Sequence, residues 1–198
     1  MSGAAKPSVA GPTLLRPAVA ADARAIAELF LLSSDGLAAY IWRKVDPNAA
    51  DLLDVGERRY ARTNTAFSYE NCLVAEAGGA VAGMLHGFGM ETRGEPDEDP
   101  VLRPYSELEE TPSFYIAGIA VHAPYGRRGI GRQLMQAAAV RARAEGFGRL
   151  SLIVFEENVP ALGLYLKLGF EEIARRPLVP CPELHYSQGD AVLMVAPV

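Results

Sequence analysis

Two apolar runs joined by a glycine-rich turn and a helix constrain the fold of this chain more than any other feature. Residues 113–121 (SFYIAGIAV) and 149–155 (RLSLIVF) are apolar enough to be strands inside a sheet. Between them, residues 129–145 place apolar side chains along one stripe of a helix. A strand, a helix and a second strand in this order predict an α/β fold.

The segments on either side extend this pattern to a sheet with several helices. Gly78 and Gly79 join two β-type runs within residues 71–90, which is a hairpin signal. Asp22 is placed to cap a helix, and Pro47 stands near the start of another. Further strands are expected at residues 13–19, 170–175 and 190–197, and further helices at residues 21–34, 36–45, 47–62 and 158–169. We therefore predict one domain over residues 11–198, built on a mixed sheet.

The composition is that of a globular domain without a strong charge bias. Of the 198 residues, 49% are hydrophobic and 22% charged, and the net charge of −5 gives no reason to expect nucleic acid or a membrane as a partner. Residues 1–17 lack the apolar core of a signal peptide, and we expect a disordered tail over residues 1–10. Cys72 and Cys181 are too few for a disulfide framework, so we expect a cytoplasmic protein.

An acidic segment without helical or strand period separates the hairpin from the first buried run. Its acidic residues are Glu91, Glu95, Asp97, Glu98, Asp99, Glu107, Glu109 and Glu110. Loops of this length inside a compact domain are often functional or mobile, and a turn of helix is expected near residues 106–110. A solvated acidic surface is the simpler explanation of the same residues.

The stretch YGRRGIGRQL, residues 125–134, combines glycines and arginines at the expected start of a helix. The first amides of a helix lack intrahelical acceptors and lie at the positive end of the helix dipole. Gly129 and Gly131 would leave those amides accessible, and arginine suits phosphate geometry, so the turn predicts a phosphate site. A tight turn with a helix cap and solvent-facing arginines explains the residues without a ligand.

Two familiar phosphate motifs do not fit this turn. A nucleotide-hydrolysing P-loop would end in G-K-[ST], which is absent here. After Gly131 the chain reads Arg132-Gln133-Leu134, so the dinucleotide pattern G-x-G-x-x-G also fails. The turn alone therefore does not identify the phosphate compound.

A second motif follows in NVPALGLYLKLGF. Asn158 and Tyr165 are seven residues apart, which places them on nearly the same face of a helix and ~10 Å apart along its axis. An amide and a phenol aligned in this way can serve one elongated ligand. Packing alone also accounts for Tyr165 as a buried aromatic residue.

Taken together, the two motifs resemble the GNAT superfamily of acyl-CoA-dependent N-acetyltransferases. The resemblance rests on IAGIAVHAPYGRRGIGRQLMQAA and, further along, LIVFEENVPALGLYLKLGF. It is strong over residues 116–170, plausible at RPAVAADARAIAELF, and weak over residues 33–68 and after Ala174. It implies the family's fold, a single α/β domain with a mixed, mostly antiparallel sheet flanked by helices.

The resemblance also implies a site for acetyl-CoA, matched residue by residue. Its pyrophosphate would lie on Arg127, Arg128, Gly129, Ile130, Gly131 and Arg132. Ile119, Ala120 and Val121 would pair with the pantetheine arm like an added strand, and Asn158 would contact the pantetheine or diphosphate region. The Val121 amide would face the thioester oxygen, and Tyr165 matches the family's general acid.

Two departures from the family pattern stand out. Gly126 replaces the usual Gln or Arg at the first position of the turn, so binding would depend on backbone amides and the following arginines. Residues 113–121 contain no acid, although many members carry a glutamate base on this strand. His86, His122 and an acid of residues 91–110 are candidates for the base, and we assign none of them.

Neither covalent catalysis nor a metal is expected. Direct transfer needs no enzyme nucleophile, and Cys72, on a predicted strand away from the motifs, is interpreted as a small core residue. His185, four residues after Cys181, is too isolated to predict a metal site.

The leading hypothesis is therefore an enzyme that transfers acetyl from acetyl-CoA to a primary amine by direct attack in a ternary complex. The acidic segment favours a cationic acceptor, either a small molecule such as a polyamine or basic amino acid, or a lysine-rich protein. The alternatives are an acyl-CoA sensor without turnover and a transferase for another acyl group. By analogy, residues 36–45 and 177–189 would border the acceptor site, and a homodimer is one possible assembly.

Overall fold

A seven-stranded sheet organises the computed structural model, which describes residues 12–198. Its strands are β1 (Leu14–Pro17), β2 (Cys72–Ala77), β3 (Ala80–Met90), β4 (Ser113–Val121), β5 (Arg149–Phe155), β6 (Glu171–Pro177) and β7 (Asp190–Pro197). They lie in the order β1-β2-β3-β4-β5-β7-β6, and within this sheet only β4 and β5 pair in parallel. The predicted mixed, mostly antiparallel sheet is confirmed, while the predicted tail at residues 1–10 lies outside the described residues.

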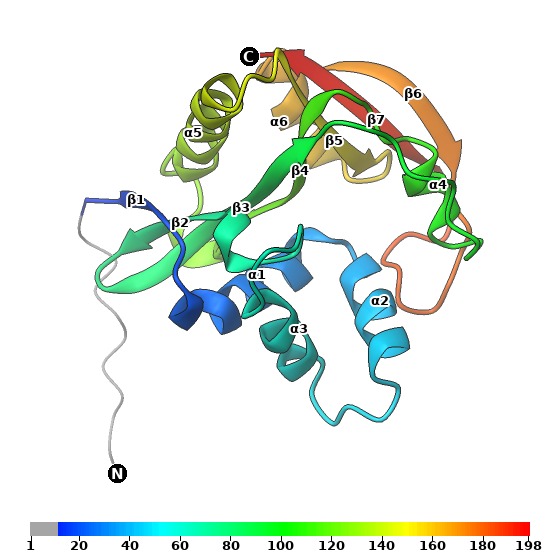
Figure 1. Ribbon diagram of the computed structural model, residues 1–198, viewed down its shortest axis with the longest axis horizontal. Coiled ribbons are helices and arrows are strands. Elements are labelled where there is room, and N and C mark those ends of the chain that lie inside the picture. Colours follow the sequence, from blue (N-terminus) through cyan, green and yellow to red (C-terminus); the bar gives the residue numbers. More distant parts are fainter. Residues whose placement is uncertain (1–11) are drawn as a thin grey trace.

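Helices cover both faces of the sheet (Figure 1). They are α1 (Ala23–Ser33), α2 (Leu37–Val45), α3 (Leu52–Tyr60), α4 (Arg103–Ser106), α5 (Ile130–Ala144) and α6 (Val159–Lys167), with short 3₁₀ turns at Ala20–Asp22, Tyr69–Asn71 and Ala123–Tyr125. Helices α1, α2 and α3 lie on one side, and α5 lies on the other. Within residues 12–198, no helix has both the length and the apolar character needed to cross a membrane.

The alternation of side chains along β2 and β3 builds two separate cores. Val74 and Met84 are fully buried against α1 and α3. Their neighbours Ala75 and Leu85 point to the opposite face and are buried in the core that includes α5. The predicted hairpin at Gly78 and Gly79 forms, both glycines have positive φ, and this one hairpin anchors both layers of helices.

Three local predictions differ from the structure. Asp22 occupies the N-cap position of α1, but its carboxylate accepts from the Val19 amide at 2.8 Å and from Arg16 at 2.7 Å instead of capping the helix. Helix α3 begins well after Pro47, because the Asp51 side chain caps it by accepting from the Leu53 amide at 2.9 Å. The short helix predicted near residues 106–110 forms a few residues earlier as α4, which overlaps that range only at Ser106 and has a proline in its first turn.

The turn between α1 and α2 packs directly against the loop that precedes β7. Gly36 has φ +96, and a Cβ built there would lie 1.9 Å from the Glu183 carbonyl oxygen. Its neighbour Asp35 also has a left-handed backbone, with φ 47. Only glycine can therefore occupy position 36 without moving one of two backbones.

We expect Gly36→Ala to lower the free energy of unfolding by about 3 kcal/mol or more, since it combines backbone strain with a backbone clash. The matched control is Gly79→Ala, because Gly79 has φ +79 but a Cβ there meets no atom within 4 Å. The control should lose only ~1 kcal/mol from backbone strain. Urea unfolding of both variants checks this, and equal losses would contradict the clash.

His86 is a fully buried polar residue with both ring nitrogens engaged. Nε2 lies 2.9 Å from the Ala66 carbonyl, which can only accept, so Nε2 carries the proton and Nδ1 accepts from the Tyr60 hydroxyl at 3.1 Å. The rings of Phe30 and Phe67 pack around it. Burial lowers the pKa of His86 to about 4.

This depressed pKa predicts a pH-dependent loss of stability. In the unfolded chain histidine gains its proton near pH 6.5, whereas folded His86 gains it only near pH 4, so the stabilisation is present above pH 6.5 and is lost as the pH falls toward 4. Compared with His86→Gln, the wild type should lose about 2–3 kcal/mol more between pH 7 and pH 4.5 in urea unfolding. A parallel pH dependence of the two proteins would refute this.

Candidate active site

The parallel pair β4–β5 is short, and the two strands then separate. Phe114 to Ile116 pair with Leu150 to Leu152, and no pairing continues beyond them. At the same point the register between β3 and β4 skips Ala117, which forms a bulge. After these pairs β4 and β5 diverge. The edge of β4 that faces away from β3 therefore has no partner strand beyond Ile116.

Backbone amides of β4 point toward this opening. The His122 amide donates to the Ala82 carbonyl on β3 at 2.8 Å. Because successive amides of a strand point to opposite edges, those of Val121 and Ile119 point away from β3, toward the side where β5 has diverged. These donors are available to an extended ligand lying along β4.

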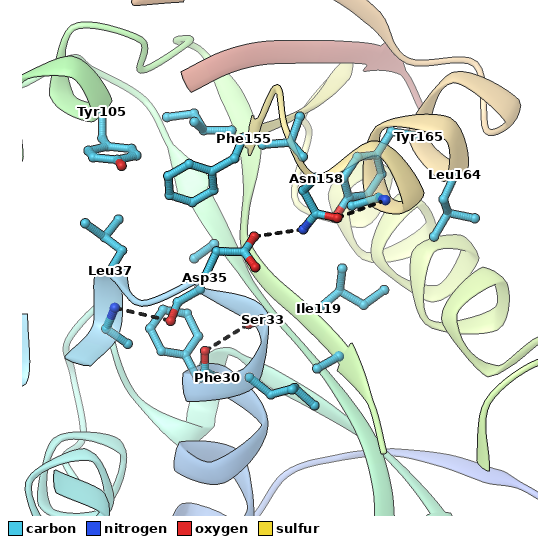
Figure 2. Close-up of a pocket in the computed structure, with 18 of the residues that line it drawn as sticks. Phe30, Ser33, Asp35, Leu37, Tyr105, Ile119, Phe155, Asn158, Leu164 and Tyr165 are labelled. Carbon is cyan, nitrogen blue, oxygen red and sulfur yellow. Dashed lines mark hydrogen bonds between the residues drawn. The ribbon is translucent and has the colours of Figure 1, made fainter. Parts of the chain in front are cut away.

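A cavity of about 640 Å³ fills the space between the separated strands and continues to the α1–α2 turn (Figure 2). Ile119, Ala120 and Val121 line it from β4, and Asn158 and Tyr165 line it from α6. The structure therefore brings these five predicted site residues to one cavity, although β4 and α6 are distant in the sequence.

The glycine turn leads from β4 into α5 outside this cavity. Gly129 is the N-cap with φ 78 and offers no side-chain cap. The first bond of the helix joins the Gln133 amide to the Gly129 carbonyl at 3.0 Å, so the amides of Ile130, Gly131 and Arg132 precede the ladder. A Cβ at Gly131 would meet no atom within 4 Å, so protein packing does not require glycine there.

The predicted phosphate-binding arginines are exposed around this helix start. Arg127, Arg128 and Arg132 all lie at the surface, and Arg127 has φ 60. The Arg128 guanidinium lies over the Tyr125 ring at 5.8 Å. Charge and accessible amides thus coincide at one end of α5.

Asn158 and Tyr165 have distinct environments on α6. The Asn158 Oδ1 caps the helix by accepting from the Ala161 amide at 3.2 Å, and its Nδ2 donates to Asp35 at 2.8 Å. Tyr165 is buried, and burial together with the negative charge of Asp35 raises its pKa to about 12. Its phenol therefore stays protonated throughout the neutral pH range.

Asp35 and Tyr105 are cavity residues that sequence reasoning missed. Figure 2 shows the Asp35 carboxylate directed into the cavity toward Asn158. The Tyr105 hydroxyl is buried without a hydrogen-bond partner. The Asp35-Gly36 pair is a turn signal in the sequence, but nothing in the local pattern indicates that the turn faces the motifs.

None of the candidates for a general base named from the sequence lines the cavity. Both ring nitrogens of His86 are engaged in the core, and His122 follows the end of β4 outside the cavity. The acidic segment contributes three carboxylates to ion pairs elsewhere, namely Asp99 with Lys44, Glu107 with Arg176 and Glu110 with Arg149. Among residues 12–198, no acidic side chain of the 91–110 segment lines the cavity.

Three further expectations concern Cys72, metal sites and the two segments near the acceptor. Cys72 is buried in the core and burial raises the pKa of its thiol, as expected for a structural residue. The described part of the chain contains no group of three or more His, Cys, Asp or Glu side chains able to hold a metal ion. Of the two segments expected near the acceptor, α2 lines the cavity, whereas no residue of the 177–189 loop does. This loop contacts a lining residue, Asp35, whose carbonyl accepts from the His185 amide at 2.9 Å.

Comparisons with known proteins agree with this geometry. An N-alpha-acetyltransferase of Sulfurisphaera tokodaii is 37% identical over 101 residues, covering 48% of this chain and 56% of that protein. An L-ornithine N5-acetyltransferase of Arabidopsis thaliana is 41% identical over 56 residues, covering 28% of this chain and 25% of that protein. The matched parts thus span only a quarter to about half of these relatives.

Solved structures match over nearly the whole chain. A crystal structure of an acetyltransferase has a TM-score of 0.65 at 25% identity, covering 93% of this chain and 99% of that one. The Salmonella typhimurium protein yncA, solved with its cofactor acetyl-CoA, has a TM-score of 0.59 at 22% identity and shares the fold over 93% of both chains. The profile of the acetyltransferase (GNAT) family matches residues 39–170. With the split sheet, the open helix start and this match over most of its length, the chain belongs to the GNAT acetyltransferase family.

Proposed function

We propose that the protein transfers an acetyl group from acetyl-CoA to a primary amine by direct attack in a ternary complex. The observation that carries the proposal is the separation of β4 from β5, which directs the Ile119 and Val121 amides into the cavity that Tyr165 lines. Membership of the GNAT family and a structural neighbour that holds acetyl-CoA support it. The two free cysteines suit a reducing cytoplasm, which is where we place the activity.

The coenzyme would lie across the turn and along β4. The pyrophosphate would sit on the amides of Ile130, Gly131 and Arg132, with charge from the neighbouring arginines. The pantetheine arm would then pair with β4 as an added strand, because Ile119 and Val121 present free donors there. Asn158 keeps one amide hydrogen beyond its bond to Asp35, and this hydrogen can reach the arm.

Two hydrogen-bond donors at the cavity, the Val121 amide and the Tyr165 phenol, would carry the chemistry. The Val121 amide would stabilise the oxyanion that forms when the amine attacks the thioester carbonyl. The Tyr165 phenol would donate to the departing sulfur. Since its pKa is about 12 and a thiol has a pKa of about 8.5, complete transfer costs ~5 kcal/mol in this environment. Tyr165 therefore acts chiefly as a hydrogen-bond donor unless its surroundings change during the reaction.

A second candidate function is acyl-CoA sensing without turnover. It draws support from the absence of any acid on β4 and from Gly126, which replaces the usual polar residue of the turn. The buried phenol at the cavity argues against it, because a binding protein has no use for a proton donor beside the sulfur.

The enzyme hypothesis predicts a specific effect of Tyr165→Phe. Thiol release from acetyl-CoA, measured with a panel of primary amines, should show turnover by the wild type and a kcat about 100-fold lower in the variant. The Kd for acetyl-CoA should change less than twofold, because phenylalanine keeps the ring packing against Phe170.

Two results would count against this hypothesis. A wild type that binds acetyl-CoA but releases no thiol with any amine would favour the sensor. A variant with the wild-type kcat would remove Tyr165 from the reaction, even if the enzyme is active.

A further inference from the structure

We infer that Asp35 is the catalytic residue that binds the acceptor's ammonium group and takes its proton, and that the acceptor is a compact monoamine with an apolar body. The inference rests on the proposed function and adds to it the missing base and a substrate class. It follows from the position of Asp35 and from the charges and apolar walls of the cavity.

Asp35 is held rigidly at the wall of the cavity. Its carbonyl accepts from the His185 amide at 2.9 Å, and its Oδ2 accepts from the Asn158 Nδ2 at 2.8 Å. Gly36 follows with φ +96 and no room for a side chain. The side chain of Asp35 is only 15% exposed, so the carboxylate is both fixed and largely withdrawn from solvent.

Among the described residues that line the cavity, Asp35 is the only one with an acidic or basic side chain. Phe30, Leu37, Ile41 and Phe155 form much of the surrounding wall. No Lys or Arg side chain within residues 12–198 lines the cavity, and the nearest basic group to the carboxylate is the His185 imidazole, whose Nδ1 lies 3.7 Å from Oδ1. The carboxylate would therefore attract an ammonium group and hold it beside the thioester site. Figure 2 shows the Asp35 carboxylate directed into the cavity that Ile119 of β4 also lines.

The proton balance of the reaction requires such a group. An alkylammonium brings three N–H bonds and its amide product keeps one, so two protons must leave nitrogen. The first passes to Asp35, which frees the lone pair to attack the thioester carbon. The C–S bond breaks as the tetrahedral intermediate collapses, and Tyr165 gives its hydroxyl proton to the departing sulfur. The second nitrogen proton then returns to the Tyr165 oxygen, so the thiol is released and the phenol is restored. The proton held by Asp35 is the one released to solvent overall.

His185 offers a route for that proton. Its Nδ1 lies 3.7 Å from Asp35 Oδ1, and its side chain is 61% exposed. Imidazole commonly carries protons between a buried group and water. A proton taken up by Asp35 can thus reach the surface without returning through the cavity.

Protonation of Asp35 would also affect Tyr165. The negative charge of Asp35 contributes to the raised pKa of this phenol. Once the acceptor's proton neutralises Asp35, that contribution disappears and the phenol becomes a better donor. The acid would therefore strengthen at the step in which sulfur leaves.

The substrate class follows from what surrounds Asp35. One carboxylate matches one ammonium, and the acidic segment places no second carboxylate at the cavity among the described residues, so a polyamine would bury unpaired charge. Tyr105 also lines this space. The remaining walls suit an aliphatic or aromatic body.

Two isosteric probes test the assignment. 2-Phenylethylamine arrives protonated, whereas O-benzylhydroxylamine has the same shape but is neutral at pH 7 and needs no base before attack. In Asp35→Asn, kcat/KM for 2-phenylethylamine should fall at least 100-fold, and that for O-benzylhydroxylamine about fivefold or less. Wild-type kcat/KM for spermidine should lie at least tenfold below that for 2-phenylethylamine.

Controls separate this inference from a structural role and from the proposed function itself. Asp46→Asn, a surface substitution at an ion pair with Arg58, should leave both rates unchanged.

Several outcomes would contradict the inference. Equal losses with the two probes in Asp35→Asn would show that Asp35 only positions α6, and no loss would show that it is not the base. A wild type that prefers spermidine, or binds acetyl-CoA but acetylates neither probe, would overturn the acceptor class. Failure to bind acetyl-CoA would instead refute the proposed function.

Discussion

The parallel pairing of β4 with β5 ends after Ile116 and Leu152, and the rest of the site depends on that ending. A continued ladder would have consumed the inner amides of β4 and closed the space between the strands. Because the strands separate, Ile119 and Val121 keep free donors and a cavity of about 640 Å³ opens beside them. An unpaired strand edge inside a protein is costly unless a ligand or water occupies it, so we expect an extended partner to bind along this edge.

The hydrogen bond between Asp35 and Asn158 joins the two halves of the chain across that cavity. It connects the α1–α2 turn with the start of α6, 123 residues later. Asn158 thereby caps α6 with its oxygen and orients Asp35 with its nitrogen. The same carboxylate influences Tyr165, so the groups expected to take and give protons are electrostatically linked.

Much of the fold was predictable from local patterns, and the site was predictable only in part. Strand alternation, the Gly78–Gly79 hairpin and the glycine turn before α5 are encoded within short segments, and the structure contains all three. The predicted cap at Asp22 was wrong because its carboxylate binds Arg16 instead. The predicted helix start near Pro47 was wrong because Asp51 caps α3 further along the chain. Asp35 and Tyr105 could not be found, since their importance arises from packing against segments more than 40 residues away.

Binding of acetyl-CoA to Gly131→Glu, measured by calorimetry, tests the central claim most directly. Glutamate fits the open space and suits a helix N-terminus, so the fold should survive while the new carboxylate repels the pyrophosphate. Gly148→Glu adds the same charge at another open, exposed glycine. We expect micromolar binding by the wild type and by Gly148→Glu, and at least 100-fold weaker binding by Gly131→Glu. Equal affinities in all three would show that the coenzyme does not lie on the start of α5.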